Sequence, residues 1–257
     1  MSLDMFAWIA PFIGVGIFFF LERYCFKVEN KTKRRVSTIL SIQVATIFTN
    51  LALSLFFLVP LVFLLAPLQI YSFSKLNVPI LISFTFSFLF LDLVNYLNHY
   101  LHHKVPLLWR FHRLHHSDCK IDSLTTFLHH PFELASTFFV TIALATIFDV
   151  PVIVLITYAL IVGFHAAFTH LNILLPERVA KILNFLVVTP NFHKIHHSTN
   201  IKEGNANFGI MFVFWDYLFR TTIRKCNYDL ILMTTGIDNR QSPKKISVLT
   251  FLTNPFK

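Results

Sequence analysis

The chain has 257 residues and a formal net charge of +9, and 55% of its residues are hydrophobic. Only 14% are charged, and the apolar residues form long runs, which excludes an ordinary soluble domain and indicates an integral membrane protein. The positive charge does not indicate nucleic-acid binding, because no soluble binding module surrounds it and membrane topology explains it better. Three cysteines without a C-x-x-C pair predict no disulfide framework.

The N-terminal part, residues 1–77, is predicted to contain two membrane helices. Met5–Leu21 is expected to be a retained membrane helix, because the apolar run lacks the basic start of a signal peptide. The connection 22–35 is rich in Lys and Arg, so the positive-inside rule places it in the cytoplasm. Docking of an acidic redox partner or an anionic lipid is the alternative interpretation of these charges. Ile39–Ala66 is long enough for a second, tilted span.

Val78–Asn98 is predicted to return the chain to the cytoplasm, so that His99 lies at the cytoplasmic end of this span. Its alternating phenylalanines are expected to spread around the helix and face lipid. Asp92 is the exception, because a carboxylate inside a membrane segment is costly and usually faces inward. It is expected either to orient a metal-binding histidine or to form a hydrogen bond between helices.

Leu134–Phe148 and Val152–Thr169 are predicted to form a shallow helical hairpin. One continuous helix would exceed the bilayer thickness and would carry Asp149 and Pro151 in its middle. A hairpin brings the following residues back to the cytoplasmic side. Asn207–Phe219 is expected on the membrane surface, with Trp215 at the interface, and residues 223–257 form a polar, basic tail. The predicted fold is therefore an all-α membrane bundle of about four to five membrane helices with a cytoplasmic histidine-rich cap.

All thirteen histidines lie between His99 and His197. Residues 112–116 and 193–197 repeat the spacing H-x-x-H-H, and His99 and His103 are four residues apart. Because residues three and four apart share a face of a helix, the histidines of each segment can point the same way. Two metal ions with about four nitrogen ligands each would use these eight imidazoles. A carboxylate-rich site is not available, because the chain has only five glutamates.

The other histidines have weaker patterns. His102 and His129 are expected to be structural. His130 precedes Pro131, so its backbone should be extended. It is expected either to be structural or to contact a metal-binding residue. His165 and His170 are five residues apart, about 140° round a helix, so they are not expected to bind the same metal.

Residues 78 to 222 resemble the membrane-bound sterol desaturase and fatty acid hydroxylase superfamily. The motifs that carry the resemblance are Asp92 with His99–His103, Leu108–Ser117, His130–Glu133, His170–Asn172, Thr189–Ser198, Asn207–Gly209 and Trp215–Phe219. The resemblance implies a catalytic domain with a non-haem di-iron centre on the cytoplasmic side. The implied ligands are His99, His103, His112, His115, His116, His170, His193, His196 and His197, with Asp92, His130 and His165 as possible outer contacts. Iron rather than zinc rests on the resemblance, and zinc is expected to be able to occupy the site in purified protein.

The resemblance also implies O2-dependent oxidation of a C–H bond in a sterol, a fatty acyl chain or another lipid. Electrons would come from an external donor of the cytochrome b5 or ferredoxin type, because the chain shows no flavin, haem or iron–sulfur motif. Hydroxylation and desaturation both remain open, and both the bacterial inner membrane and the endoplasmic reticulum are possible locations. The alternative is a metal-binding membrane protein without oxidative chemistry, either a metal carrier or a zinc-stabilised scaffold. The concentration of the histidines in one region favours the enzyme.

Overall fold

The computed structural model describes residues 13–25, 33–68, 78–237, 249 and 253. Within these ranges the chain is helical, with two isolated bridges and no strand, so the predicted all-α class is confirmed. The first predicted span, Met5–Leu21, lies outside the described residues up to residue 12. Residues 13–20 are α-helical, and Leu21–Cys25 continues as a π-helical turn.

The second predicted span is part of one long helical rod. The rod consists of α2 (Lys33–Leu53), the π-helical segment η2 (Ser54–Leu58), α3 (Val59–Leu65) and the 3₁₀ turn η3 (Ala66–Leu68). Pro60 has no N–H to donate, and directly before it the N–H of Val59 donates to the carbonyl of Ser54 in π-type spacing. Residues Val36–Leu68 are long and apolar enough to cross a membrane.

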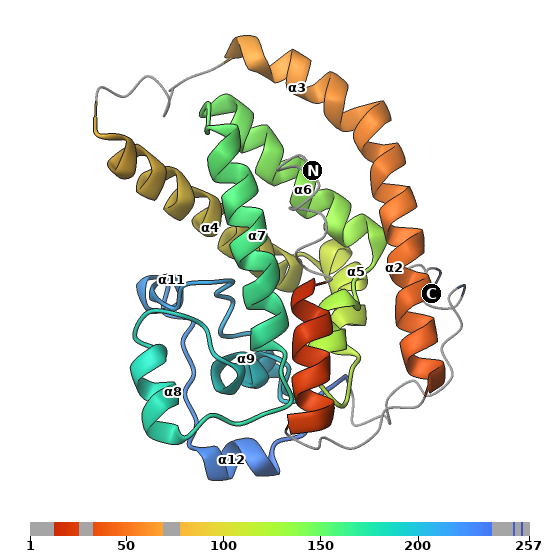
Figure 1. The fold of residues 1–257 in the computed structure, drawn as a ribbon, viewed down its shortest axis with the longest axis vertical. Helices are drawn as coiled ribbons and strands as arrows, with labels where there is room; N and C mark the ends of the chain where they lie inside the picture. Colours follow the sequence, from red (N-terminus) through yellow and green to blue (C-terminus); the bar gives the residue numbers. More distant parts are fainter. Residues whose placement is uncertain (1–12, 26–32, 69–77, 238–248, 250–252, 254–257) are drawn as a thin grey trace.

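The third span, α4 (Ile80–Lys104), ends at Val105, which is extended because Pro106 follows it. Pro106 then opens α5 (Pro106–His116), and the 3₁₀ turn η5 (Ser123–Phe127) follows. The predicted hairpin is confirmed as α6 (Pro131–Ile147) and α7 (Val152–Thr169), which turn back on each other in Figure 1. Asp149 adopts a left-handed φ of 50° in the turn. Both α4 and α7 could cross a membrane, whereas α6 is shorter.

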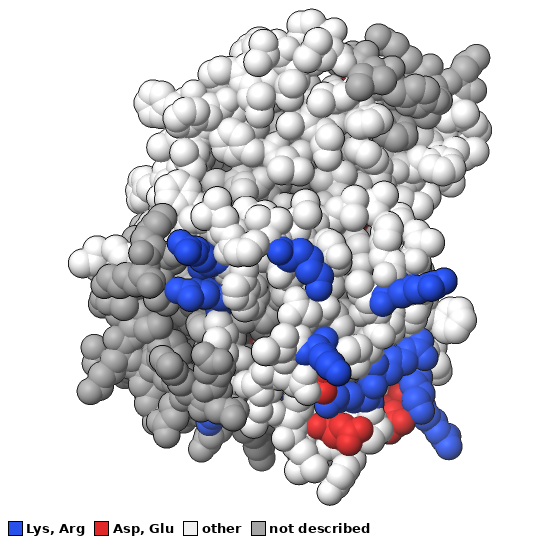
Figure 2. Space-filling view, turned by 180° about the vertical axis from the view of Figure 1, so that it is seen from behind, with Lys and Arg blue, Asp and Glu red and all other residues white. Residues whose placement is uncertain are grey.

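Five short helices follow at one end of the bundle. They are α8 (Glu177–Leu183), α9 (Pro190–His196), α10 (Ile201–Gly204), α11 (Phe214–Leu218) and α12 (Asn227–Leu232). The hydroxyl of Thr189 caps α9, and Pro190 occupies the first helical position, where no N–H is needed. Seen from behind in Figure 2, the Lys and Arg side chains lie on the lower part of the molecule. This is the end at which α8 and α12 lie in Figure 1.

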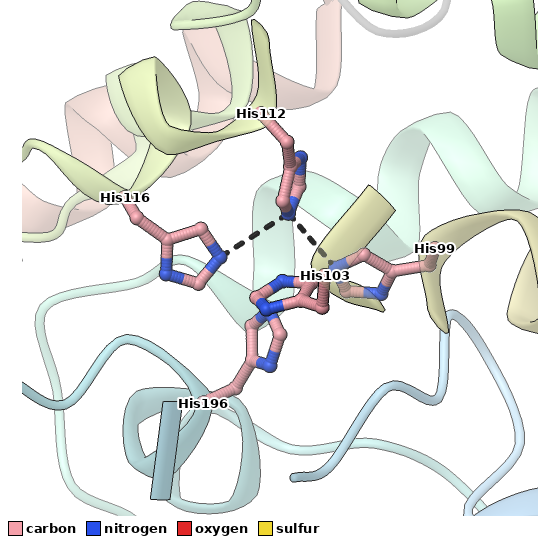
Figure 3. A group of neighbouring side chains, drawn as sticks. All are labelled: His99, His103, His112, His116 and His196. Atoms are coloured by element: carbon pink, nitrogen blue, oxygen red, sulfur yellow. Dashed lines mark hydrogen bonds between the residues drawn. The ribbon is translucent and has the colours of Figure 1, made fainter. Parts of the chain in front are cut away.

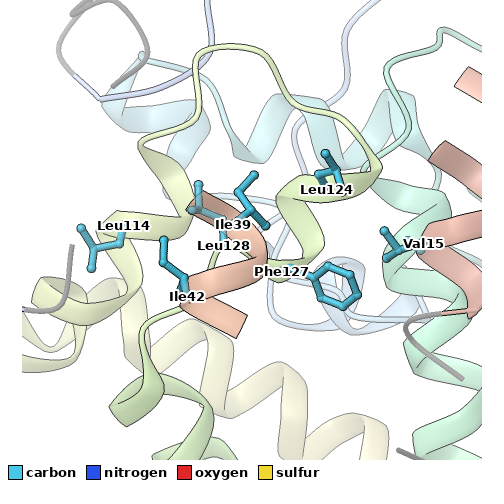
Figure 4. Close-up of a cluster of buried hydrophobic side chains, with 8 residues drawn as sticks. Val15, Ile39, Ile42, Leu114, Leu124, Phe127 and Leu128 are labelled. Carbon is cyan, nitrogen blue, oxygen red and sulfur yellow. The ribbon is translucent and has the colours of Figure 1, made fainter. Parts of the chain in front are cut away.

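Two buried apolar clusters hold the helices together. The first joins Val15, Ile39 and Ile42 of the N-terminal helices to Leu114, Leu124, Phe127, Leu128 and Ala167 (Figure 4). The second lies between α4 and the hairpin and includes Phe88, which is only 8% exposed. The expectation that the alternating phenylalanines all face lipid was therefore wrong for Phe88. At about 100° per residue, Phe84 and Phe88 share the packed face of α4, whereas Phe86 is 59% exposed.

Glu22, which the sequence placed in the connection after the first span, is instead buried against the histidine-rich end. Its carboxylate accepts from the hydroxyl of Ser123 at 2.6 Å and from the backbone N–H of Asn172 at 2.7 Å. It thereby fixes the first helix to the segments that follow α5 and α7.

Replacing Glu22 with alanine is expected to destabilise the protein, because these buried donors lose their acceptor at a cost of about 1–3 kcal/mol each. The apparent melting temperature in detergent should fall by several degrees. The neighbouring exposed residue Arg23 provides a matched control, since Arg23→Ala should leave the melting temperature nearly unchanged. Equal melting temperatures for both variants would contradict the role of Glu22.

Candidate metal centre

The structure brings nine histidines together in two neighbouring groups. The first imidazole group consists of His99, His103, His112, His116 and His196 (Figure 3), and the second consists of His115, His170, His193 and His197. Within each group one nitrogen per ring lies within 4.8 Å of the others. These nine are the histidines that the sequence analysis proposed as ligands. Their metal binding stays a prediction.

Each H-x-x-H-H motif contributes to both groups. His112 and His116 belong to the first group and His115 to the second; His193 and His197 belong to the second and His196 to the first. At about 100° per residue, positions four apart differ by only about 40°, while the position between them lies about 60° to the other side. The expectation that the three histidines of a motif all point the same way was therefore wrong, because each motif directs two rings to one group and one ring to the other. The rings of His116 and His197 stack between the groups with centroids 4.4 Å apart.

Hydrogen bonds at the outer nitrogens fix the orientation of four rings. The Nδ1 atoms of His99 and His196 donate to the carbonyls of Phe208 and Ala206, each at 2.8 Å. His170 Nδ1 donates to the carbonyl of Ala166 at 2.7 Å, and His112 Nδ1 lies 2.6 Å from Glu133 Oε1. Carbonyl and carboxylate oxygens only accept, so these Nδ1 atoms carry the proton. The lone pair of each ring is therefore on Nε2, which faces its group.

This protonation pattern fits a pair of bound cations. The Nε2 atoms of His99 and His112 are 3.2 Å apart, and neither has a proton to place between them. In the second group, His170 Nε2 lies 3.0 Å from His193 Nε2. Burial lowers the pKa of His115 and His193 well below the usual range, so a second proton on these rings does not balance the nitrogens that face each other. A metal ion in each group would do so, because neutral imidazole is a common metal ligand.

Glu133 connects the two groups through its contacts with histidines. The residue is 4% exposed, and its Oε1 accepts from Nδ1 of His112 at 2.6 Å and from Nδ1 of His129 at 2.7 Å. The ring of His129 stacks on that of His115, with centroids 4.1 Å apart. Sequence reasoning treated His129 as structural and gave Glu133 no role. The available signal was their spacing of four residues at the start of a helix.

Asp92, which was expected either to orient a ligand or to bond between helices, has partners on other helices. Asp92 accepts from the hydroxyl of Tyr158 at 3.1 Å and from the indole N–H of Trp215 at 2.9 Å. Among the described contacts no histidine donates to it, so the structure favours the hydrogen bond between helices. The same contact directs the indole N–H of Trp215 to Asp92, and the predicted place of this half-buried residue at the membrane interface stays a prediction.

The remaining histidines stand outside both groups. His130 is extended, as predicted, and its Nδ1 accepts from the N–H of Phe132 to cap α6. His165 lies on α7 apart from His170, in agreement with the angle between them. His102 donates to the carbonyl of Asn98 at 2.8 Å and contacts the hydroxyl of Ser136.

A model of the fatty acid hydroxylase family matches residues 84–221, which is more than half of the chain and includes all nine of these histidines. The chain therefore belongs to the fatty acid hydroxylase family, as the resemblance implied.

The names of similar curated proteins describe enzymes that modify lipid molecules. Ornithine lipid hydroxylase OlsE of Rhizobium tropici is 34% identical over 130 residues, which is 49% of this chain and 37% of that protein. Very-long-chain aldehyde decarbonylase GL1-4 of Oryza sativa subsp. indica is 27% identical over 163 residues, 60% of this chain and 25% of that protein. The chain thus spans well under half the length of these relatives. No solved structure matches it significantly.

Proposed function

We propose that the protein is an O2-dependent lipid oxidoreductase whose two imidazole groups hold a di-iron centre. The reaction would oxidise a C–H bond of a sterol, a fatty acyl chain or another lipid. The observation that carries this proposal is the convergence of nine buried or half-buried imidazoles, four of them with Nε2 lone pairs directed into the groups. The lipid class is supported by the family and by the names of its relatives.

Iron bound in these groups would supply the activation of O2 and the oxidising strength that an unactivated C–H bond requires. The chain's own residues do the rest of the work. The carbonyls of Ala166, Ala206 and Phe208 hold ring protons on the outer nitrogens. Glu133 stabilises the N–H groups of His112 and His129. Burial of His196 and His197 keeps water from the reacting region.

Electrons would come from a separate donor of the cytochrome b5 or ferredoxin type. The concentration of Lys and Arg at the histidine-bearing end supports a site that faces the cytoplasm, by the positive-inside rule. The membrane would be the bacterial inner membrane or the endoplasmic reticulum. The choice between hydroxylation and desaturation is a matter for product analysis; the similarity to a lipid hydroxylase supports hydroxylation.

Protein purified from iron-supplied cells is expected to contain about two iron ions per chain, one for each imidazole group. It should consume O2 when a reductant and a lipid extract are added. A chelator should stop the consumption, and Fe(II) but not Zn(II) should restore it. Mass spectrometry of lipids from cells with and without the protein should show a product that gains one oxygen or loses two hydrogens.

Zinc alone in such protein, with no consumption of O2, would contradict the oxygenase. That result would favour the metal carrier or the zinc-stabilised scaffold.

A further inference from the structure

A single turn, residues 206–209, supplies acceptors to two histidines of the first imidazole group. The carbonyl of Ala206 accepts from His196 Nδ1, and the carbonyl of Phe208 accepts from His99 Nδ1, each at 2.8 Å. Both Ala206 and Phe208 are buried. In the second group, His170 instead donates to a carbonyl of its own helix. Among the described contacts, the carbonyls of the turn therefore accept from rings of the first group only.

Asp216 holds this turn in place from the N-terminal part of α11. Its carboxylate accepts from the backbone N–H groups of Phe208 and Gly209, each at 2.8 Å, and from the hydroxyl of Thr221 at 2.6 Å. Burial raises the pKa of Asp216 to about 6, and the three donors that face its two oxygens favour the carboxylate form. A Cβ at Gly209 would lie 2.8 Å from the Oδ2 of Asp216, so only glycine allows this close approach.

Asn207 fixes the turn from the other side. Its φ of 57° is left-handed, a conformation that asparagine tolerates better than most residues. Its side-chain amide donates to the carbonyl of Phe192 at 3.0 Å and accepts from the N–H of Ile223 at 2.7 Å. Phe192 lies on α9 beside His193, so Asn207 joins the turn to the helix that carries the second motif.

We propose that Asp216 and Asn207 are positioning residues that set the tautomer of His99 and His196 and so tune metal affinity in the first group alone. This inference rests on the proposed function, because it requires that the groups bind metal. The physical reason is that an acceptor at Nδ1 fixes the ring and raises the basicity of Nε2. If the carbonyls move away, the proton can occupy Nε2, and the lone pair of that ring is then on Nδ1, which does not face the group.

The test is metal retention in an Asp216→Asn variant of the full chain. The amide has nearly the same volume, but its NH2 group would face backbone N–H donors, so the turn should shift. Protein is loaded with Co(II), which has visible absorption bands, and is then titrated with a chelator. The wild type is expected to hold about two ions, whereas one ion in the variant should be bound about 10- to 100-fold more weakly with the other unchanged. Histidine ¹⁵N NMR of metal-free Asp216→Asn protein should show the proton of His99 or His196 on Nε2, whereas in the wild type it is expected on Nδ1.

Asp92→Asn is the matched control, because Asp92 is also a fully buried carboxylate with side-chain and backbone donors. Its partners lie at residues 158, 212 and 215 and not in the turn, so this variant should lose stability without losing one ion selectively. Asn207→Gly keeps the left-handed backbone and removes the side-chain bonds. It should show the same selective loss as Asp216→Asn, and it carries the test if that variant does not fold.

The possible results separate the two proposals. Two ions with unchanged affinity in Asp216→Asn and Asn207→Gly would overturn the positioning role and leave the proposed function intact. Equal weakening of both ions, or the same loss in Asp92→Asn, would also overturn it, because the effect would then be general. A wild type that binds no metal would overturn both.

Discussion

Replacing His116 or His197 with alanine is expected to lower the rate of lipid oxidation by more than about 100-fold. Losing a residue that only hydrogen-bonds to a metal ligand already lowers metal affinity or activity by about 10- to 100-fold. The two rings belong to different groups, and both are almost completely buried. Each substitution should therefore weaken a different ion. Metal content and product formation, measured on the same preparations, check this result.

His102 is the control for these two substitutions. It is also a buried histidine of the same region, with hydrogen bonds to Asn98 and Ser136, but it lies outside both groups. His102→Ala should reduce stability and keep both ions. If all three variants lose metal equally, the losses reflect misfolding, and the assignment of ligands to groups is contradicted.

Glu133→Gln is expected to reduce metal affinity and activity by about 10- to 100-fold. The glutamine has almost the same shape, but it removes the negative charge that strengthens the bonds from His112 and His129. The first group contains His112 and should suffer most. The second should be affected less, because Glu133 reaches it only through the stacking of His129 on His115. Chelator competition on metal-loaded protein measures the two affinities.

Glu177→Gln is the matched control for this carboxylate. Glu177 forms an exposed ion pair with Lys181 on α8, and solvent screens such pairs so that they add little to stability. This variant should behave as wild type. Wild-type metal affinity in Glu133→Gln as well would show that the carboxylate does not support the centre.

The sequence predicted the parts of the centre that depend on local spacing. The H-x-x-H-H repeats and the pair His99 and His103 identified eight of the nine histidines that the structure gathers, because helical periodicity acts over a few residues. The ninth, His170, came from the family resemblance. The pair Asp149 and Pro151 predicted the hairpin because a continuous helix would exceed the bilayer and carry both residues in its middle, and the hairpin returns the chain toward the first motif.

Helical spacing separates the middle histidine of each motif from the outer two, but it does not show which histidines of different segments share a group. That sharing depends on how α5 and α9 face each other, which is a property of tertiary packing. The roles of Glu22 and Asp216 were missed for related reasons. Glu22 has partners 101 and 150 residues away, and Asp216 acts through backbone groups that carry no sequence signal.

The sharing of each motif between both groups has a consequence for how the gene can vary. Inserting or deleting one residue inside either motif would rotate the downstream histidines by about 100° and would disrupt both groups at once. A change of length between the motifs, in a loop such as the one before α8, leaves the ligand register intact. Members of this family should therefore differ in the number of residues between the two H-x-x-H-H motifs and hardly ever in the number within them.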